Sequence, residues 1–291
     1  MIEGWRERAA KHGLLALVAI LLLLVSYIFY LDWVRSHRQL TFAMLDIGQG
    51  DAFFIESPTG AQVLIDVGPP NRILGALSRV ISPFDRHIDA VIITNPDQDH
   101  IGGFSELAEK YKIGKVFSPG TINGSRSYEI LKKELAGKKI PEFLARKGMK
   151  INLGGGAMIE ILFPDRDVLY WDTNDGSVVA KLSYGETEIM LMGDSTLETE
   201  RIILENYPKE ILESNILKVG HHGSRTSTGP AFVSAVSPSY ALISDGKDNK
   251  YGHPHRETLD TLTKSGVEIL RTDTLGTIVF ACARMKPCQL K

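Results

Sequence analysis

The sequence predicts an α/β fold in which two sheets pack face to face and helices cover both outer faces, a four-layer αββα sandwich. Two observations lead to this prediction. Short apolar runs of strand length alternate with amphipathic stretches of helix length along most of the 291 residues. The second half of the chain then repeats the pattern of the first half. Two similar α/β halves are expected to bury their sheets against each other in one core.

A single apolar run precedes this α/β part. Residues 13–30 contain no charged side chain, and the length of the run matches the hydrocarbon thickness of a bilayer. The run is long for a signal peptide, no small-residue cleavage pattern follows it, and it is too uniformly apolar for a buried core helix. We therefore expect an uncleaved transmembrane anchor over residues 13–33, with the lipid bilayer as its partner.

Basic residues on either side of this run predict its orientation. Arg6, Arg8 and Lys11 precede it, whereas Arg35 and Arg38 follow it. This excess favours a cytoplasmic N-terminus. We expect a short cytoplasmic tail over residues 1–12, a linker over residues 34–39, a globular domain over residues 40–282 and a C-terminal tail over residues 283–291. The protein would then be a single-pass cell-membrane protein whose globular domain lies outside the cytoplasm.

The globular domain opens as an antiparallel meander and continues with alternating helices and strands. In its first half, strands are expected at 40–45, 52–55, 62–65 and 88–93, with helices at 73–80, 102–111 and 128–135. The region from 114 to 156 shows no residues of chemical interest and is interpreted as a connecting unit. In the second half, strands are expected at 157–162, 178–184, 188–192, 216–219, 240–243, 267–270 and 277–281, with helices at 197–206, 231–236 and 257–264.

Charge and cysteine content exclude some classes of site. Residues 40–291 contain 28 Lys and Arg against 32 Asp and Glu, which gives a net charge of −4 and does not favour an extended nucleic-acid groove. Only Cys282 and Cys288 are present, so a disulfide framework and a cysteine-rich zinc site are excluded. The two cysteines could form one bridge in an oxidising compartment, or they could be a strand cysteine and a tail cysteine.

Polar residues interrupt the chain directly after four of the predicted strands. The interruptions are Thr94 to His100, Gly193-Asp194, His221 to Ser224 and, after a glycine-bearing loop, Tyr251 to His255. Each alone could be turn or helix-cap chemistry. Five of the eight histidines, however, fall in these loops, and carboxylates with imidazoles suit Zn²⁺ or Mn²⁺. Together the loops predict a site for a divalent metal ion.

These segments resemble the metallo-β-lactamase superfamily, and in particular the soluble hydrolase domain of the ComEC-type DNA-uptake channels of competent bacteria. The matching segments occur in the expected order between Leu40 and Ala281: Asp46 to Asp51, Leu64 to Gly68, Asn95 to Gly103, Gly193-Asp194, Lys218 to Ser224, Tyr251 to Pro254 and Arg271 to Asp273. The resemblance implies the αββα metallo-β-lactamase fold and a hydrolase that uses one or two divalent ions, Zn²⁺ or Mn²⁺.

The resemblance also implies roles for individual residues. As metal ligands it implies Asn95, Asp97, Asp99, His100, Asp194 and His221, with Asp194 as the bridging carboxylate. Residues expected to orient the ligands without binding the metal are Asp46, Gln49, Asp51, Asp66 and Ser224. Of these, Asp66 would hold the loop at 95–100. Catalytic roles are expected of Asp99, His222 and His253, and substrate binding of Lys218 and Arg225.

The sequence departs from the family pattern in two ways. The metal motif of the family usually begins with His, whereas this chain has Asn95, so the first metal position is expected to be weak and a one-metal site becomes an alternative. The channel proteins have many transmembrane helices, whereas this sequence has one apolar run. The chain therefore resembles a hydrolase module detached from its channel, and any channel partner is unknown.

The leading functional hypothesis is a metal-dependent phosphodiesterase or nuclease that acts on DNA outside the membrane during DNA uptake, with single-stranded DNA as a candidate substrate. A locally basic segment, 216–256, supports it. Its lysines could also be ordinary solvated loop residues. Hydrolysis of another phosphodiester, an ester or a lactone is a second hypothesis, because the fold hosts many reactions. A third is a non-catalytic module in which Asn95 marks a degenerate metal site.

Overall fold

The computed structural model describes the backbone of residues 2–36 and 39–291, and the side chains of residues 12, 13, 15–30 and 39–291. The chain divides into two compact units, Met1–Arg38 and Gln39–Lys291. The first unit is the helix α1 (Ile2–Ser36), whose described apolar side chains, such as Leu23 and Phe29, are exposed.

Within the described residues, no helix is long and apolar enough to cross a membrane. The side chains of Leu14 and residues 31–33 in the expected anchor, and those of residues 1–11 in the expected tail, lie outside the described residues. The anchor at 13–33 therefore stays a prediction.

Two mixed sheets form the second unit. The first sheet contains, in spatial order, β17 (Gln289–Leu290), β16 (Ile278–Cys282), β1 (Leu40–Met44), β2 (Phe53–Glu56), β3 (Gln62–Ile65), β5 (Ala90–Ile92), β7 (Val116–Ser118) and β8 (Glu142–Leu144). The second contains β15 (Glu268–Arg271), β14 (Tyr240–Ile243), β13 (Ile216–Lys218), β12 (Thr187–Leu191), β11 (Val179–Tyr184), β10 (Ala157–Phe163) and β9 (Lys150–Gly154). A separate small sheet pairs β4 (His87–Ile88) with β6 (Lys112–Ile113).

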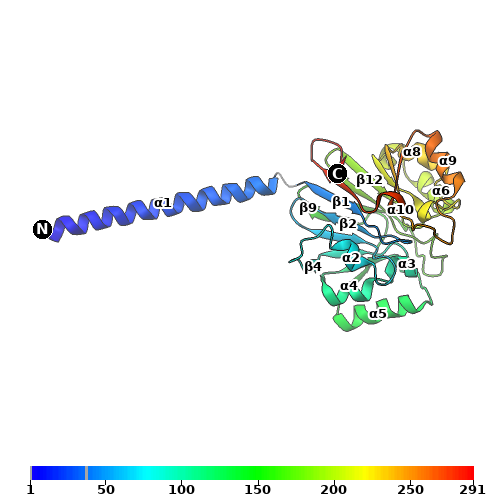
Figure 1. Cartoon of the computed structure of the whole chain (residues 1–291), viewed down its shortest axis with the longest axis horizontal. Helices are drawn as coiled ribbons and strands as arrows, with labels where there is room; N and C mark the ends of the chain where they lie inside the picture. Colours follow the sequence, from blue (N-terminus) through cyan, green and yellow to red (C-terminus); the bar gives the residue numbers. More distant parts are fainter. Residues whose placement is uncertain (1, 37–38) are drawn as a thin grey trace. The chain divides into compact units, whose positions relative to one another are not determined.

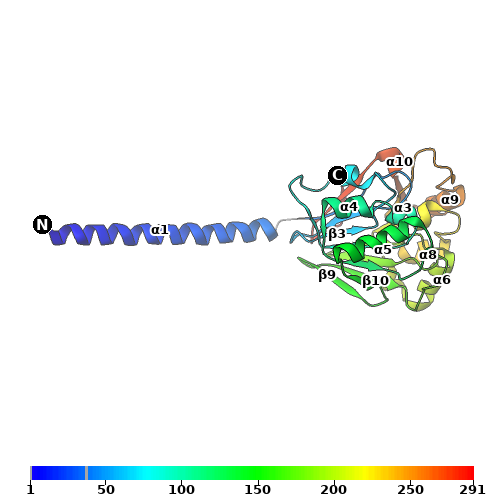
Figure 2. The same cartoon turned by 90° about the horizontal axis from the view of Figure 1, so that it is seen from below.

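Helices cover the outer faces of both sheets (Figure 1). The first sheet is covered by α2 (Ile73–Leu77), α3 (Gln98–Ile101), α4 (Phe104–Lys110) and α5 (Arg126–Lys138), of which α4 and α5 lie in front in Figure 2. The second sheet is covered by α6 (Leu197–Asn206), α7 (Lys209–Leu212), α8 (Pro230–Val236) and α9 (Arg256–Lys264). Two short elements remain, the 3₁₀ turn η1 (Gly220–Gly223) and α10 (Thr272–Leu275).

Three hydrophobic cores correspond to the three contacts between layers, which confirms the predicted αββα sandwich. Strand β1 shows how the sequence produces them. Its Phe42 and Met44 belong to the core between the sheets, whereas Ala43 and the following Leu45 belong to the core beneath α2 to α5. This alternation follows from the two-residue period of a strand that is buried on both faces.

The main difference from the predicted elements lies at residues 88–93, which were expected to form one strand. The structure divides this segment at Asp89, whose carboxylate accepts the backbone N–H of Gln62 at 2.7 Å. Strand β4 pairs with β6 in the small sheet, while β5 pairs with β3 and β7 in the large one.

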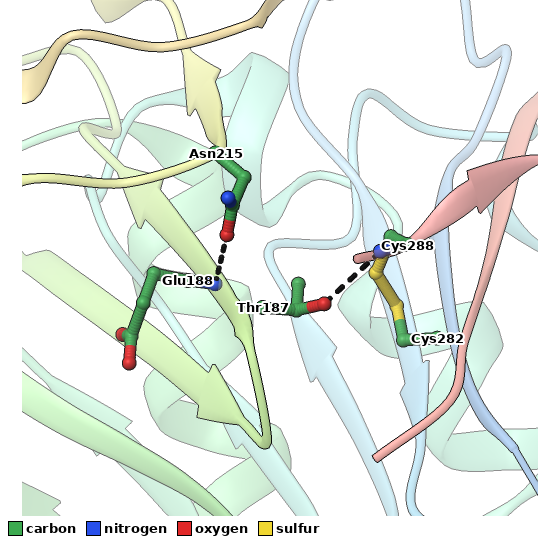
Figure 3. The surroundings of a disulfide bond; sticks show 5 residues. All are labelled: Thr187, Glu188, Asn215, Cys282 and Cys288. Atoms are coloured by element: carbon green, nitrogen blue, oxygen red, sulfur yellow. Dashed lines mark hydrogen bonds between the residues drawn. A yellow bond between two sulfur atoms is a disulfide. The ribbon is translucent and has the colours of Figure 1, made fainter. Parts of the chain in front are cut away.

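The C-terminal segment is joined to the sandwich. Strand β17 pairs with β16, and a disulfide links Cys282 to Cys288 (Figure 3). The backbone N–H of Cys288 also donates to the Thr187 hydroxyl at 3.1 Å, at the start of β12 in the other sheet. Of the two alternatives that the sequence left open for the cysteines, the structure has the bridge, and residues 283–291 are not a loose tail.

A buried carboxylate on α6 holds the loop that leads into α8. Glu200 is 2% exposed, and its two oxygens accept the backbone N–H groups of Thr228 at 2.5 Å and of Gly229 at 2.8 Å. Thr228 has a φ of 64°, a left-handed conformation that is rare for a β-branched residue. Burial raises the pKa of Glu200 to about 7, against the opposing effect of the two N–H donors.

This raised pKa predicts a pH-dependent contribution to stability. Between the usual value of 4.5 and about 7, the folded protein retains a proton on Glu200 that the unfolded chain has lost. The free energy of unfolding of wild type relative to Glu200→Gln should therefore decrease across this interval, by up to about 3 kcal/mol, and stay constant above it. Urea unfolding of both proteins across this pH range measures the difference, and a difference that is independent of pH would contradict the assignment.

Candidate metal centre

The candidate centre lies where the carboxyl ends of parallel strands meet. Strands β3 and β5 run parallel in one sheet, and β12, β13 and β14 run parallel in the other. The loops after these strands therefore open at shared sheet edges, which is where α/β folds gather functional side chains. These loops contribute Asp66, the segment 94–100, Asp194, the turn η1 and Ser244.

His100 is fixed from behind by Asp66, as the sequence predicts. The Nδ1 of His100 lies 2.8 Å from Asp66 Oδ2, and both side chains are fully buried. The other oxygen of Asp66 accepts the backbone N–H of Thr94 at 2.7 Å, which also holds the start of the 95–100 loop. A carboxylate on Nδ1 leaves Nε2 as the nitrogen that faces the centre, the usual arrangement behind a metal-binding histidine.

Three side chains, those of Asp99, Asp194 and His222, converge on the space in front of His100. Its Nε2 lies 3.0 Å from Asp194 Oδ2, without hydrogen-bond geometry. The Nε2 of His222 lies 3.4 Å from Asp194 Oδ1 and 3.5 Å from Asp99 Oδ2. Because His222 Nδ1 donates to the carbonyl of Ser244 at 2.9 Å, its Nε2 also presents a lone pair to the centre.

Several buried atoms in this space have no hydrogen-bond partner. They are His100 Nε2, His222 Nε2, Asp194 Oδ1 and Asp51 Oδ1, whereas Asp51 Oδ2 contacts the Lys218 ammonium. Leaving such atoms unpaired is costly, and the cost falls if they coordinate a cation. Three groups in this cluster can hold an ion with one atom from each residue: Asp99, His100 and His222; Asp51, Asp194 and His222; and Asp51, Asp66 and His100. Two imidazoles with carboxylates suit a divalent transition metal.

Electrostatics at the centre favour added positive charge. Burial alone would lower the pKa of His222, but Asp194 and Asp51 raise it to about 10. Burial alone would raise the pKa of Asp99, but His222 and His100 lower it to about 2. The negative charge of the neighbouring carboxylates therefore favours the protonated form of both imidazoles, His100 and His222. A bound cation would take the place of these protons.

Lys218 is a buried counter-ion and does not take the substrate-binding position predicted for it. Its side chain is 1% exposed, and its ammonium contacts Asp51 Oδ2. It also donates to the carbonyl of Gly193 at 2.6 Å and lies 3.7 Å from Asp194 Oδ1. Since its ammonium is enclosed by protein groups, the structure gives Lys218 the role of positioning Asp51 and Asp194.

Asn95 and Asp97 are not directed at the centre, contrary to their predicted role as ligands. Asn95 Oδ1 accepts the backbone N–H of Asp97 at 2.9 Å, and Asn95 Nδ2 donates to Asn174 at 2.9 Å. The two oxygens of Asp97 accept from Asn123 Nδ2 at 2.5 Å and from the Thr173 hydroxyl at 3.0 Å. Among the described His, Cys, Asp and Glu side chains, Asp97 belongs to none of the groups that could hold an ion.

The partners of Asn95 and Asp97 were missed by the sequence analysis. Asn123 lies in the segment interpreted as a connecting unit, and Thr173 and Asn174 lie in the loop before β11. Their sequence signals, Asn-Gly and Asn-Asp-Gly, are also ordinary turn signals. Nothing in the sequence alone distinguishes a turn residue from one that reaches another loop.

Of the two adjacent histidines, His222 belongs to the groups that could hold an ion, whereas the predicted ligand His221 lies beside the centre, where burial lowers its pKa and Asp194 opposes that shift. Both residues have left-handed φ angles, 47° and 52°, and their rings diverge with an interplanar angle of 71°. The Nδ1 of His221 lies 3.2 Å from the Thr226 hydroxyl, which donates to Ser224 at 2.9 Å. Ser224 therefore supports His221 through Thr226.

The remaining predicted residues lie around the centre or away from it. The His253 ring lies 6.4 Å from that of His222, and burial together with the positive neighbours His222 and His221 lowers the pKa of His253 to about 4. Arg225 lines a separate cavity of about 180 Å³ and pairs with Glu257 at 3.6 Å, so it does not reach the centre. Gln49 accepts the backbone N–H of Gly246 at 3.4 Å, and Asp46 is exposed.

The sequence of this chain is similar to those of several known proteins. The family model of the metallo-beta-lactamase superfamily matches residues 45–244. ComE operon protein 3 of Bacillus subtilis is 32% identical over 81% of this chain and 32% of its own length. Competence protein ComA of Neisseria gonorrhoeae is 26% identical over 90% of this chain and 35% of its own length. The chain thus spans about a third of the length of these relatives.

A solved structure shows the same fold. CmlA, a diiron beta-hydroxylase from Streptomyces venezuelae, superposes with a TM-score of 0.52 at 14% identity, over 80% of this chain and 53% of that protein. The family match covers more than half of the chain, and the relatives include competence proteins, as the order of the loop segments predicts. The chain belongs to the metallo-β-lactamase superfamily, and its relatives include competence proteins.

Proposed function

We propose that this protein is a metal-dependent phosphodiesterase that cleaves DNA and that it uses one divalent ion. The observation that carries the proposal is the set of unpaired buried atoms from His100, His222, Asp194 and Asp51. Together with Asp99 they form a donor set that fits a cation. The names of the relatives, which refer to competence and recombination, favour DNA as the substrate class.

The residues around the centre would each contribute one physical effect. Asp66 and the Ser244 carbonyl orient the His100 and His222 rings so that each Nε2 faces the same space. A divalent cation bound there would lower the pKa of water and polarise a phosphoryl oxygen. His253, with a pKa of about 4, is neutral at pH 7, so it adds no positive charge beside the centre that would oppose a bound cation.

A single ion is favoured because the loop that would supply a second ion's ligands is already hydrogen-bonded. Asn95 is paired with Asn174, and Asp97 is held by Asn123 and Thr173. Binding a second ion there would require at least three of these hydrogen bonds to break. Each would cost on the order of 1 kcal/mol, and more where the carboxylate takes part.

Metal stoichiometry tests this proposal with two carboxylates from the same loop. Wild type should bind about one Mn²⁺ or Zn²⁺ per chain. Asp99→Ala should lower the affinity and the hydrolytic rate by about 100-fold or more, whereas Asp97→Asn should retain the ion. Calorimetric titration of each metal-free protein measures this. Two ions per wild-type chain, or equal loss of the ion in both variants, would contradict it.

The substrate class is tested with two phosphodiesters. With Mn²⁺ present, the purified full chain should cleave linear single-stranded DNA and also bis(4-nitrophenyl) phosphate, and Asp99→Ala should cleave neither. If only the small ester is hydrolysed, the natural substrate is a small phosphodiester and not DNA. If neither is hydrolysed although the metal is bound, the hydrolase proposal fails and a non-catalytic module remains.

We further propose that residues 13–33 anchor the protein in the cell membrane and that the hydrolase domain lies outside the cytoplasm. The uncharged run at 13–30 and the exposed apolar side chains of α1 support the anchor. The excess of basic residues before the run supports the orientation. The Cys282–Cys288 disulfide supports it independently, because such bonds persist in oxidising compartments.

Thiol labelling in intact cells tests this topology. Cells are quenched in acid, treated with a maleimide that adds mass, and fractionated. The protein should be found in the membrane fraction without label, and it should carry two labels only if the cells are reduced before the maleimide is added. The Cys288→Ser variant, which leaves Cys282 alone, is the control and should be labelled without reduction. Double labelling of wild type without reduction, or recovery in the soluble fraction, would contradict the proposal.

A further inference from the structure

A groove leads away from the candidate metal centre across the loops after β1, β3 and β14. It consists of two adjoining cavities of about 430 and 560 Å³. The first is lined by Asp99 of the centre, and the second extends to Arg79. Both are lined by Gly48, Gln49, Arg72 and Asn249, which shows that they are continuous. We call this surface the basic groove.

Four exposed basic side chains line the basic groove: Arg72, Arg79, Lys247 and Lys250. In the part of the chain that the structure describes, none of the four forms an ion pair with an acidic residue. Several basic residues elsewhere on the domain are paired, as Arg201 is with Glu198 and Glu205. Two carboxylates, Asp46 and Asp99, also line the groove, so its four basic side chains give it a net positive charge on a domain whose net charge is negative.

An aromatic ring lies in the cavity of the basic groove that Asp99 of the metal centre also lines. Tyr251 is 52% exposed and lines the first cavity. Its ring stacks on that of His253 at 5.7 Å with an interplanar angle of 22°, and the Lys250 ammonium lies 5.0 Å from the centre of the Tyr251 ring. A cationic groove that carries an exposed aromatic ring is the combination that binds single-stranded nucleic acid, since phosphates meet the cations and a base stacks on the ring.

The loop that carries three of these side chains is held in place by Asn249. Its Nδ2 donates to the carbonyls of Gly246 at 3.0 Å and His253 at 2.6 Å. Its Oδ1 accepts the backbone N–H groups of Tyr251 at 3.2 Å and His253 at 3.0 Å. Lys247, Lys250 and Tyr251 therefore project from a braced loop, which lowers the cost of ordering them on a ligand.

We propose that the basic groove binds the backbone of a single-stranded polynucleotide and leads it to the metal centre. The inference rests on the proposed phosphodiesterase function and extends it, because it assigns a binding surface beyond the reacting phosphate. Arg79 and Lys247 would contact phosphates remote from the cleaved bond, and Tyr251 would stack on a base near it.

Binding without metal tests the groove separately from catalysis. The probe is a fluorescent oligothymidylate, mixed with the full chain in EDTA, and anisotropy gives the Kd at several salt concentrations. The double variant Arg79→Glu/Lys247→Glu should weaken binding by about tenfold or more and reduce the slope of log Kd against log salt by about 1.4, the value for two phosphate contacts on a single strand. Tyr251→Ala should weaken binding and leave this slope unchanged.

A matched control carries the same change in net charge outside the groove. Lys115 and Lys264 are exposed and do not line it, so Lys115→Glu/Lys264→Glu should bind the oligonucleotide as wild type does. Equal loss of affinity in both double variants, or no loss in the groove variant, would overturn the proposal, as would tighter binding of a duplex than of the single strand.

Hydrolysis separates failure of the groove from failure of the proposed function. With Mn²⁺, the groove variant should lose at least about tenfold more activity on single-stranded DNA than on bis(4-nitrophenyl) phosphate, which is too small to span the groove. Equal losses on both substrates would contradict the groove. Absence of hydrolysis in wild type would instead remove the phosphodiesterase function, while the binding measurement would still report on the surface.

Discussion

The structure of the site depends on buried negative charge that needs a cation. Asp51, Asp66 and Asp194 are each at most 3% exposed and lie within one cluster. Removing several carboxylates from water is costly unless positive charge compensates them. Lys218 supplies one positive charge, and the two histidines could supply more only by taking up protons. A divalent cation compensates the same carboxylates and leaves the imidazoles as ligands.

The second sheet provides Lys218 and Asp194, and the first provides Asp51 and Asp66, so the charge cluster also joins the two halves of the sandwich.

The fold makes this cluster possible because its backbone is rigid where the side chains meet. Parallel pairing of β12, β13 and β14 brings the loops that follow them to one edge. Close packing then limits what those loops can contain. A Cβ atom on Gly50 would lie 2.2 Å from the backbone oxygen of Asp99, and one on Gly193 would lie 2.8 Å from the Thr94 side chain. Both positions also have positive φ angles, so glycine is required for conformation as well as for space.

The fold and the general location of the site could be predicted from the sequence, because both depend on periodic burial and on which strand each polar segment follows. The choice between neighbouring side chains could not. His221 and His222 are adjacent residues of the same type, and only the tertiary structure shows that His222 Nε2 lies 3.4 Å from Asp194 Oδ1. Asn95 and Asp97 were predicted as ligands by position in a motif, but partners from distant loops, Asn123 and Asn174, draw them away. Such contacts depend on tertiary structure and leave no local signal.

The most direct test of a single ion in the buried cluster is the anomalous scattering of a crystal grown with Mn²⁺. One peak should lie between His100 Nε2, His222 Nε2 and the carboxylates of Asp99 and Asp194, with Asp97 still hydrogen-bonded to Asn123. A peak coordinated by Asp97, or no peak in the buried cluster at saturating Mn²⁺, would contradict the argument that these carboxylates require a cation.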